Sequence, residues 1–246
     1  MPGEGLRVGD ADKAELSSAS SGRWCDPSSG RRIETSAGKG VLCRITLHAR
    51  VEMAPIDVFR LMTAPDNSPA FRDIYSVPRH KVLTDDGHGK RVVEMEQCTG
   101  FKFLSFPISF ATRLVMETDE GNLTIKFRLA KKGPMKVFQG VWRVCEAEGG
   151  RGRASIVELE QDVLPAFIPP FCGGFLRGVS VRAIRRVAED LDAVALRLGG
   201  GETLEGVLGG AAKSESVSES GKRIESFPLA VDCDLSDEEG EIAATR

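Results

Sequence analysis

Residues 164–198 read LPAFIPPFCGGFLRGVSVRAIRRVAEDLDAVALRL, a proline-rich apolar loop followed by a long helical pattern. Apolar residues recur every three or four positions after residue 175, which is the period of a helix with one buried face. They are Leu176, Val179, Ala183, Val187, Leu191, Val194 and Leu198. At about 1.5 Å per residue, a helix over residues 171–198 extends about 40 Å and can cross several strands. The pattern therefore predicts a helix that covers a sheet and ends at the glycines 199–201.

The chain before this helix reads as a series of strands. Residues 41–53 alternate between apolar and polar side chains, which is typical of a strand with one wet face. Pro55 then suits the first turn of a short helix over residues 54–62, and residues 70–74 suggest one more helical turn. Six further strands are expected over residues 77–83, 90–98, 107–117, 123–129, 136–145 and 154–163, each followed or preceded by turn residues. We predict an α+β fold of the helix-grip type, in which a curved antiparallel sheet of about seven strands wraps around the long C-terminal helix.

Composition limits the class of protein. The 246 residues are 41% hydrophobic and 28% charged, enough for one sizeable core, and the net charge of −3 gives no reason to expect a nucleic-acid partner. We expect a domain over residues 41–198 between a disordered leader, residues 1–40, and an acidic disordered tail, residues 199–246. The tail holds 11 acidic and four basic residues, so the body is mildly basic. The role of the tail is open.

Scattered cysteines and the absence of long apolar runs bear on compartment and cofactors. The six cysteines form no CxxC pair, which argues against a zinc site or a disulfide scaffold, and no run reaches the length of a membrane span. We expect an intracellular monomer without a metal or cofactor. A cytoplasmic location is favoured, and a chloroplast or mitochondrion is left open by the Ser-, Gly- and Arg-rich start.

Several motifs resemble a known superfamily. The run MAPIDVFRLMT at 53–63 looks like the entry into its first helix, and FQGVWRV at 138–144 resembles a strand of its coenzyme Q-binding branch. VVEMEQ at 92–97, FKFL at 101–104 and MKVFQGVW at 135–142 are similar to a plant and algal branch of unknown function. The chain thus resembles the START-like superfamily, which includes polyketide cyclases and lipid-transport proteins, over residues 41–198. This resemblance implies the fold more strongly than the chemistry, because carriers, sensors and cyclases share the scaffold.

A helix laid across a bent sheet leaves a gap where the two diverge, and apolar gaps with a few polar groups are the usual small-molecule sites. The candidate ligand-binding residues lie on the apolar strand phase, the first helix, the proline-rich loop or the long helix. They are Phe59, Met62, Met95, Gln97, Phe103, Phe110, Phe127, Phe138, Trp142, Gln161, Phe167, Phe171, Phe175 and Val179. The aromatics fit a filled core equally well. The amides of Gln97 and Gln161 need a backbone, water or ligand partner, and a quinone or sterol oxygen would suit them.

These residues predict non-catalytic binding of a lipid, quinone or other hydrophobic small molecule, with transfer of that molecule left open. The alternatives are an enzyme of the polyketide cyclase or aromatase type and a protein-interaction module with a filled core. Signals for catalysis are thin: His80 has no acid or nucleophile at a meaningful spacing, and Glu94 and Glu96 alternate with apolar residues and are expected to face water.

The proline-rich loop suggests a peripheral membrane contact. An exposed tip at Phe167 and Ile168 could enter a bilayer interface while arginines meet anionic headgroups. The arginines concerned are Arg177, Arg182, Arg185 and Arg186. The alternative is a core-packed loop beside a solvated arginine face.

Overall fold

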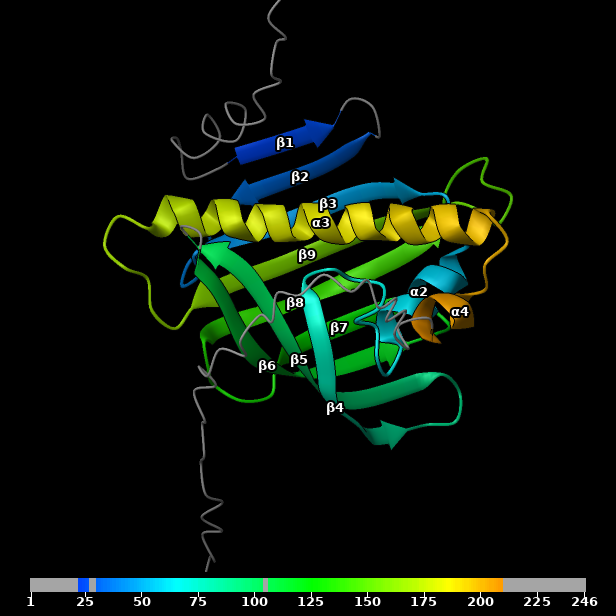
Figure 1. Cartoon of the computed structure of the whole chain (residues 1–246), viewed down its shortest axis with the longest axis horizontal. Helices are drawn as coiled ribbons and strands as arrows, with labels where there is room; N and C mark the ends of the chain where they lie inside the picture. The colour runs from blue at the N-terminus through cyan, green and yellow to red at the C-terminus, as the bar shows by residue number, and fades with distance from the viewer. Residues whose placement is uncertain (1–21, 27–29, 104–105, 210–246) are drawn as a thin grey trace, which may run out of the picture. The chain divides into compact units, whose positions relative to one another are not determined.

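A nine-stranded antiparallel sheet crossed by one long helix forms the body of the protein in a computed structural model (Figure 1). The structure describes residues 22–26, 30–103 and 106–209. For residues 101–103 and 106–108 it describes the backbone but not the side chains. The strands are β1 (Gly22–Asp26), β2 (Arg31–Ser36), β3 (Cys43–Val51), β4 (Ile74–Asp85), β5 (Lys90–Phe103), β6 (Phe106–Asp119), β7 (Thr124–Leu129), β8 (Met135–Glu146) and β9 (Ser155–Pro165). The described helices are α2 (Pro55–Thr63), α3 (Gly173–Gly199) and α4 (Leu204–Gly209).

The strand order is β1-β2-β3-β9-β8-β7-β6-β5-β4, with the first and last strands at the two edges. Helix α3 lies closest to β2 and β3, and Figure 1 shows the strands from β8 to β4 continuing beyond it. We call the face toward α3 the inner face. On β3 the residues Cys43, Ile45, Leu47, Ala49 and Val51 are buried there, at alternate positions as the sequence predicts.

Helix α3 begins two residues later than predicted, because Pro169 and Pro170 belong to the loop before it. Its fully buried apolar side chains lie in the second half of the helix. They are Ile184, Ala188, Leu191, Val194 and Ala195. From Gly173 to Ala183 no side chain is fully buried, and Ala183, predicted to face the core, is exposed. The C-terminal half of the helix therefore packs closely against the sheet, and side chains of its N-terminal half are less buried.

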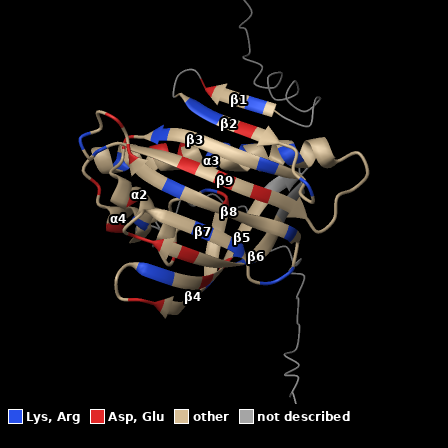
Figure 2. Cartoon of the chain, turned by 180° about the vertical axis from the view of Figure 1, so that it is seen from behind, with Lys and Arg blue, Asp and Glu red and all other residues tan. Residues whose placement is uncertain are grey.

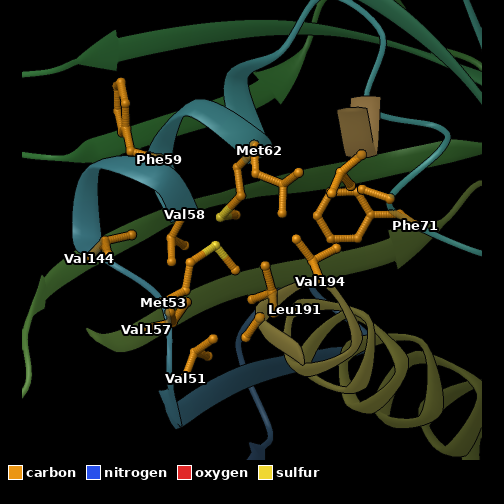
Figure 3. Packing of buried hydrophobic residues seen from close by; sticks show 14 of the residues in the cluster. Val51, Met53, Val58, Phe59, Met62, Phe71, Val144, Val157, Leu191 and Val194 are labelled. Atoms are coloured by element: carbon orange, nitrogen blue, oxygen red, sulfur yellow. The ribbon is translucent and has the colours of Figure 1, made fainter. Parts of the chain in front are cut away.

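Two apolar clusters form the core beneath α3, and Leu176 and Val181 of its first half pack against the second cluster as partly buried side chains. In the first, Val58 and Met62 of α2 pack against Phe71, Leu191 and Val194 (Figure 3). The second joins β2, β3, β9 and α3 through residues that include Ile33, Ile45, Leu159, Ile184 and Ala188. Trp142 and Met116 pack against both clusters and connect them.

Folded structure extends beyond the predicted boundaries at both ends. The leader was expected to be disordered up to residue 40, yet β1 and β2 form a hairpin that pairs with β3. Ile33 and Arg31 are buried, and the guanidinium of Arg185 lies 5.6 Å from the Trp24 ring, so the hairpin is held by two buried residues and by contact with α3. Beyond residue 199, predicted to be disordered tail, α4 forms because Val207 packs into the core. Residues 70–73 form turns rather than the expected helical turn.

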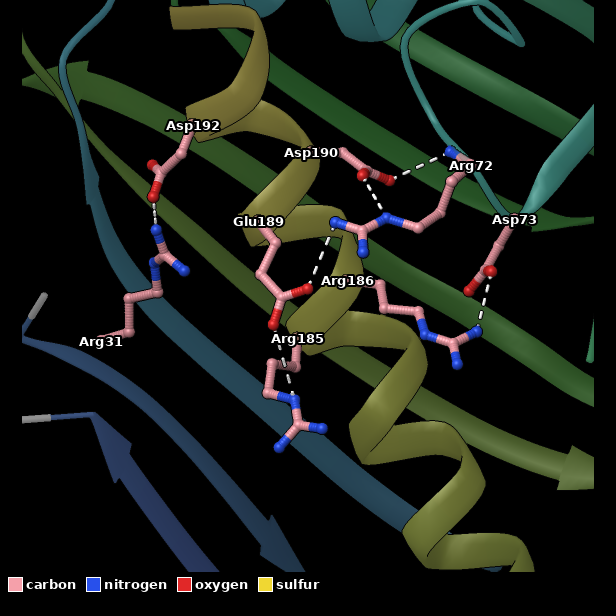
Figure 4. A network of polar contacts seen from close by, with 8 residues as sticks. All are labelled: Arg31, Arg72, Asp73, Arg185, Arg186, Glu189, Asp190 and Asp192. Atoms are coloured by element: carbon pink, nitrogen blue, oxygen red, sulfur yellow. Dashed lines mark hydrogen bonds and ion pairs between the residues drawn. The ribbon is translucent and has the colours of Figure 1, made fainter. Parts of the chain in front are cut away.

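Ion pairs hold α3 on both flanks (Figure 4). On one flank, Arg31 of β2 pairs with Asp192. On the other, Asp190 accepts hydrogen bonds from the Arg72 Nε at 2.5 Å and from the Arg72 backbone N–H at 3.1 Å. Arg186 donates to Asp73 at 2.9 Å on the same flank. The segment before β4 is thus tied to α3 by two ion pairs. In one the helix supplies the acid, Asp190, and in the other it supplies the base, Arg186.

The outer face of the sheet carries paired charges of both signs (Figure 2). Glu94 pairs with Arg79 at 2.8 Å and Glu96 with Arg113 at 2.8 Å, each across neighbouring strands. The two glutamates therefore lie on the outer face, as expected, and their carboxylates are engaged in ion pairs rather than free for proton transfer.

Gly140 tests this packing. A Cβ at this position would lie 2.4 Å from the Glu160 carbonyl oxygen and 2.8 Å from the Phe127 ring. We expect Gly140→Ala to lower the free energy of unfolding by about 1–3 kcal/mol, because the ring and the neighbouring strand must both shift. Gly133→Ala, where a Cβ meets nothing within 4 Å, is the matched control. Urea unfolding measures both, and equal stability of the two variants would contradict the described register.

Candidate functional site

The predicted ligand-binding residues on the strands share the inner face. Residues directly opposite each other in an antiparallel pair lie on the same side of the sheet. Gln161 lies opposite Gly140, which lies opposite Phe127, and Phe138 lies opposite the buried Val163. Trp142 lies opposite the buried Leu159, Gln97 opposite Thr112, and Met95 opposite Leu114. Register alone therefore gathers both amides and the aromatic residues of β7 and β8 on the side of α3.

Large apolar side chains on this face are less buried near the first half of α3. Phe110 and Phe138 of the sheet and Phe175 and Val179 of the helix are only half-buried. Because 11 residues make three helical turns, Phe175 and Val179 lie on the same flank of α3 as Arg186 and Asp190, the flank that contacts the segment before β4. This flank faces the segment before β4, on the side of α3 away from β2. We call Gln97, Phe110, Phe138, Gln161, Phe175 and Val179 the inner-face site.

Gln161 is the unusual member of the inner-face site. Gln161 is only 6% exposed, yet its side-chain amide forms no hydrogen bond with the part of the chain that the structure describes. Among the described residues, only Arg31 Nε, Asn67 Oδ1 and Arg185 Nε are both enclosed and unbonded side-chain atoms. The Gln161 amide is not among them, so it faces space that a water molecule can enter. A buried amide that keeps such space open is a ready partner for a polar group of a ligand.

The other polar groups nearby differ in this respect. On the same strand and face, the Ser155 hydroxyl donates to the Met53 carbonyl oxygen at 2.5 Å. The Gln97 amide and the Thr112 hydroxyl, like Gln161, form no hydrogen bond within the described residues. Polar groups without a protein partner therefore occur on β5, β6 and β9, and all lie on the inner face.

Not every predicted residue joins the inner-face site. Phe59 and Met62 are 4% and 8% exposed and belong to the packed core beside α2. Met95 and Phe127 are buried on the inner face, and the Phe127 and Phe138 rings lie 5.4 Å apart. Phe167 is 74% exposed and Phe171 is fully exposed, so both lie outside the site. The Phe103 side chain lies outside the described residues.

Two hollows on the outer face have a different character. One, of about 750 Å³, is lined by residues that include Asp85, Lys90, Arg91 and Asp119. The other, of about 390 Å³, is lined by Arg44 and Asp162 and also reaches Gly140 and Gln161. Both are rimmed by charges that already pair with each other, such as Arg44 with Asp162 at 2.7 Å.

Sequence reasoning considered His80 for catalysis and set it aside, but did not place it on the inner face. His80 of β4 lies opposite Met95, and burial lowers the pKa of its imidazole. The register of β4 shifts at three points, so simple alternation along this strand does not report which face a residue occupies. Burial also raises the pKa of the Cys43 thiol to about 11, which leaves it protonated at neutral pH.

The described residues contain no group of three or more His, Cys, Asp or Glu side chains that could hold a metal ion. No described helix is both long and apolar enough to cross a membrane.

The contrast between Gln161 and Ser155 gives a stability test. Gln161→Leu removes an amide without a protein partner and keeps similar volume, so we expect the free energy of unfolding to stay within about 0.5 kcal/mol or to rise. Ser155→Ala strands a buried carbonyl oxygen and should lower it by about 1–2 kcal/mol. Chemical unfolding of both variants without added ligand measures the difference. A loss with Gln161→Leu as large as with Ser155→Ala would show that the amide has a structural partner.

Comparisons with known proteins agree with the architecture. A family model described as a domain of unknown function, DUF220, matches residues 32–147, and no curated protein sequence matches the chain. A STAR-related lipid transfer protein from Xanthomonas axonopodis has 12% identity and a TM-score of 0.50, and the match covers 72% of this chain and 99% of that chain. This chain therefore has the START-like helix-grip fold, as predicted.

Two further solved structures are similar at lower TM-scores. An 18 kDa protein from Caulobacter crescentus has 23% identity and a TM-score of 0.46, with 64% of this chain and 98% of that chain covered. An aromatase/cyclase from Streptomyces sp. R1128 has 14% identity and a TM-score of 0.44, with 63% of this chain and 93% of that chain covered. The likeness to a plant and algal branch stays a prediction.

Proposed function

We propose that the protein binds a lipid, quinone or similar hydrophobic small molecule at the inner-face site, without catalysing a reaction on it. The observation that carries the proposal is the Gln161 amide, buried yet unbonded and open to water-sized space. A purely structural amide on a buried strand would be expected to find a protein partner, as the Ser155 hydroxyl does.

The surrounding residues indicate the chemistry of the ligand. Half-buried phenylalanines and Val179 offer apolar contact, while Gln97, Thr112 and Gln161 offer uncharged hydrogen-bond donors and acceptors. None of these side chains carries a formal charge. A mainly apolar molecule with one or two carbonyl or hydroxyl oxygens matches this set, and an anion does not.

The same residues argue against a protein-interaction module with a filled core. A filled core would bury its large apolar side chains along the whole of α3, as it does from Ile184 to Ala195. The first half of the helix instead leaves Phe175 and Val179 half-buried against an inner face that holds unbonded polar groups.

Filling the space tests the proposal. Val179→Trp places a large side chain between α3 and β5–β6, whereas Ala193→Trp adds the same side chain on an exposed position of the same helix. We expect Val179→Trp to weaken binding of the apolar dye Nile red at least tenfold and to remove any small molecule that native mass spectrometry finds on the purified protein. Ala193→Trp should change neither, and circular dichroism checks that both variants fold.

If the two variants bind alike, or if the wild-type protein takes up no lipid, quinone or dye, the carrier proposal is wrong. Gln161→Leu then separates the polar contribution. It should weaken a ligand that bears a carbonyl by roughly fivefold to tenfold and leave a pure hydrocarbon unaffected.

One observation favours the alternative, an enzyme of the polyketide cyclase or aromatase type. His80 lies on the inner face with a lowered pKa, so its neutral imidazole could accept a proton at neutral pH. Burial is the cause of that shift, and no carboxylate orients the ring among the described residues. We therefore expect His80→Ala to leave ligand affinity within about twofold and to alter no covalent feature of the bound molecule, as judged by mass spectrometry. A change in the structure of the recovered molecule would favour the enzyme.

A further inference from the structure

One end of the sheet carries positive charge without negative charge. The turns between β2 and β3 and between β7 and β8, and the loop from β9 into α3, all lie at this end. The sequence has no Asp or Glu at positions 35–51, 121–145 or 163–188, which include all three connections. The turns at the opposite end contain acidic residues, among them Asp86, Glu120 and Glu148. The sheet is therefore polarised along its strands.

Four exposed lysines contribute positive charge at this end. Lys39, Lys131, Lys132 and Lys136 are exposed, and none forms an ion pair with a residue that the structure describes. The outer face differs, because many of its arginines are paired with acids. Unpaired lysines on connecting turns are available to an anionic partner.

Two exposed phenylalanines project from the same end. Phe167 is 74% exposed and Phe171 fully exposed, and both lie on the loop between β9 and α3. The Ala166 N–H donates to the Pro134 carbonyl oxygen at 2.8 Å, which fixes this loop beside the turn that contains Lys131 and Lys132. The Arg177 Nε donates to the Leu42 carbonyl oxygen at 3.2 Å, which joins the start of α3 to the turn that contains Lys39. The phenylalanines and lysines thus share one rigid surface.

The backbone at Phe171 supports a specific role for this loop. Phe171 has a φ of +66°, in the left-handed region that bulky residues avoid at a cost on the order of 1–2 kcal/mol. A strained residue whose side chain contacts solvent gains nothing from packing in the folded monomer. Ile168, by contrast, packs against the core.

We propose that this end of the molecule docks on an anionic membrane surface, with Phe167 and Phe171 in the interface and Lys39, Lys131 and Lys132 against the headgroups. Exposed aromatic side chains flanked by free cations, without nearby acids, match the two requirements of interfacial binding. Three of the four arginines that the sequence suggested for headgroup contact already have partners within the protein, so lysines take this role in the proposal. Arg177 binds the Leu42 carbonyl oxygen, Arg185 contacts Trp24 and Glu189, and Arg186 binds Asp73. The proposal does not depend on whether a ligand is carried.

Vesicle flotation of the full chain tests the proposal. We expect the protein to float with vesicles of phosphatidylcholine and phosphatidylserine at 7:3, roughly, in about 0.1 M salt, and to float far less with phosphatidylcholine alone or in about 0.5 M salt. Lys131→Gln with Lys132→Gln should weaken binding about 30-fold, as for two cations near an anionic surface. Phe167→Ser with Phe171→Asn should weaken it roughly tenfold, and asparagine suits the left-handed backbone.

Matched controls lie at the opposite end. Leu196→Ser removes an exposed apolar side chain, and Arg151→Gln with Arg153→Gln removes two exposed cations. Neither control should change flotation by more than about twofold. The proposal is overturned if the full chain does not float with the anionic vesicles, or if the controls weaken flotation as much as the lysine and phenylalanine variants do. Binding to an acidic protein without vesicle binding would also overturn it.

Discussion

The packing of the second half of α3 against the sheet is the constraint on which the rest of the molecule depends. Ile184, Ala188, Leu191 and Val194 bury one stripe against β3, β9 and α2, and ion pairs to Arg31 and Arg72 hold both flanks. Toward its N-terminal end the same helix has no fully buried side chain. The half-buried Phe175 and the exposed loop at Phe171 lie at that end.

Two kinds of polar group have been kept apart by the sheet. The outer face pairs its charges across strands, which satisfies them at little energetic gain because they are exposed. The inner face holds uncharged groups without partners on β5, β6 and β9, and its buried Arg31 is paired with Asp192 of α3. Such groups weaken the empty protein slightly, and a bound molecule that supplies the missing hydrogen bonds would return that stability. Affinity and the stability of the loaded protein are then linked through the same few amides.

Much of the fold followed from periodicity. Alternation in β3 gave the correct inner residues, because that strand buries one continuous face. The three-to-four spacing gave helix α3 and its buried Leu191 and Val194, but Ala183 is exposed and Ile184 is buried in its place. Periodicity failed where a single side chain decides the outcome. Ile33 anchors β2 and Val207 anchors α4, and one apolar residue in a short polar run gives no detectable period.

The site was predicted less well than the fold. Gln161 could be placed on the inner face by alternation, whereas its lack of a partner is a property of three-dimensional packing. His80 could not be placed on the inner face because β4 contains register shifts. Phe167 was considered both as a ligand contact and as an exposed tip, and Phe171 only as a ligand contact, yet both are exposed. For the arginines of α3 the sequence predicted free charges, and most of these side chains have partners instead. Their charge was visible in the sequence, but their partners, Asp73, Glu189 and the Leu42 carbonyl oxygen, come from other segments or another turn of the helix.

The β1–β2 hairpin also changes what counts as the edge of the sheet. It pairs with β3 along most of its length, and it contributes Arg31 and Trp24 to the flank of α3. A shortened chain that starts at Val41 would turn β3, with its row of backbone N–H and C=O groups, into a free edge strand beside a helix that has lost two contacts. Free edges pair with other chains. The hairpin thus moves the free edge from the nine-residue β3 to the five-residue β1, and a short edge strand offers less backbone to another chain.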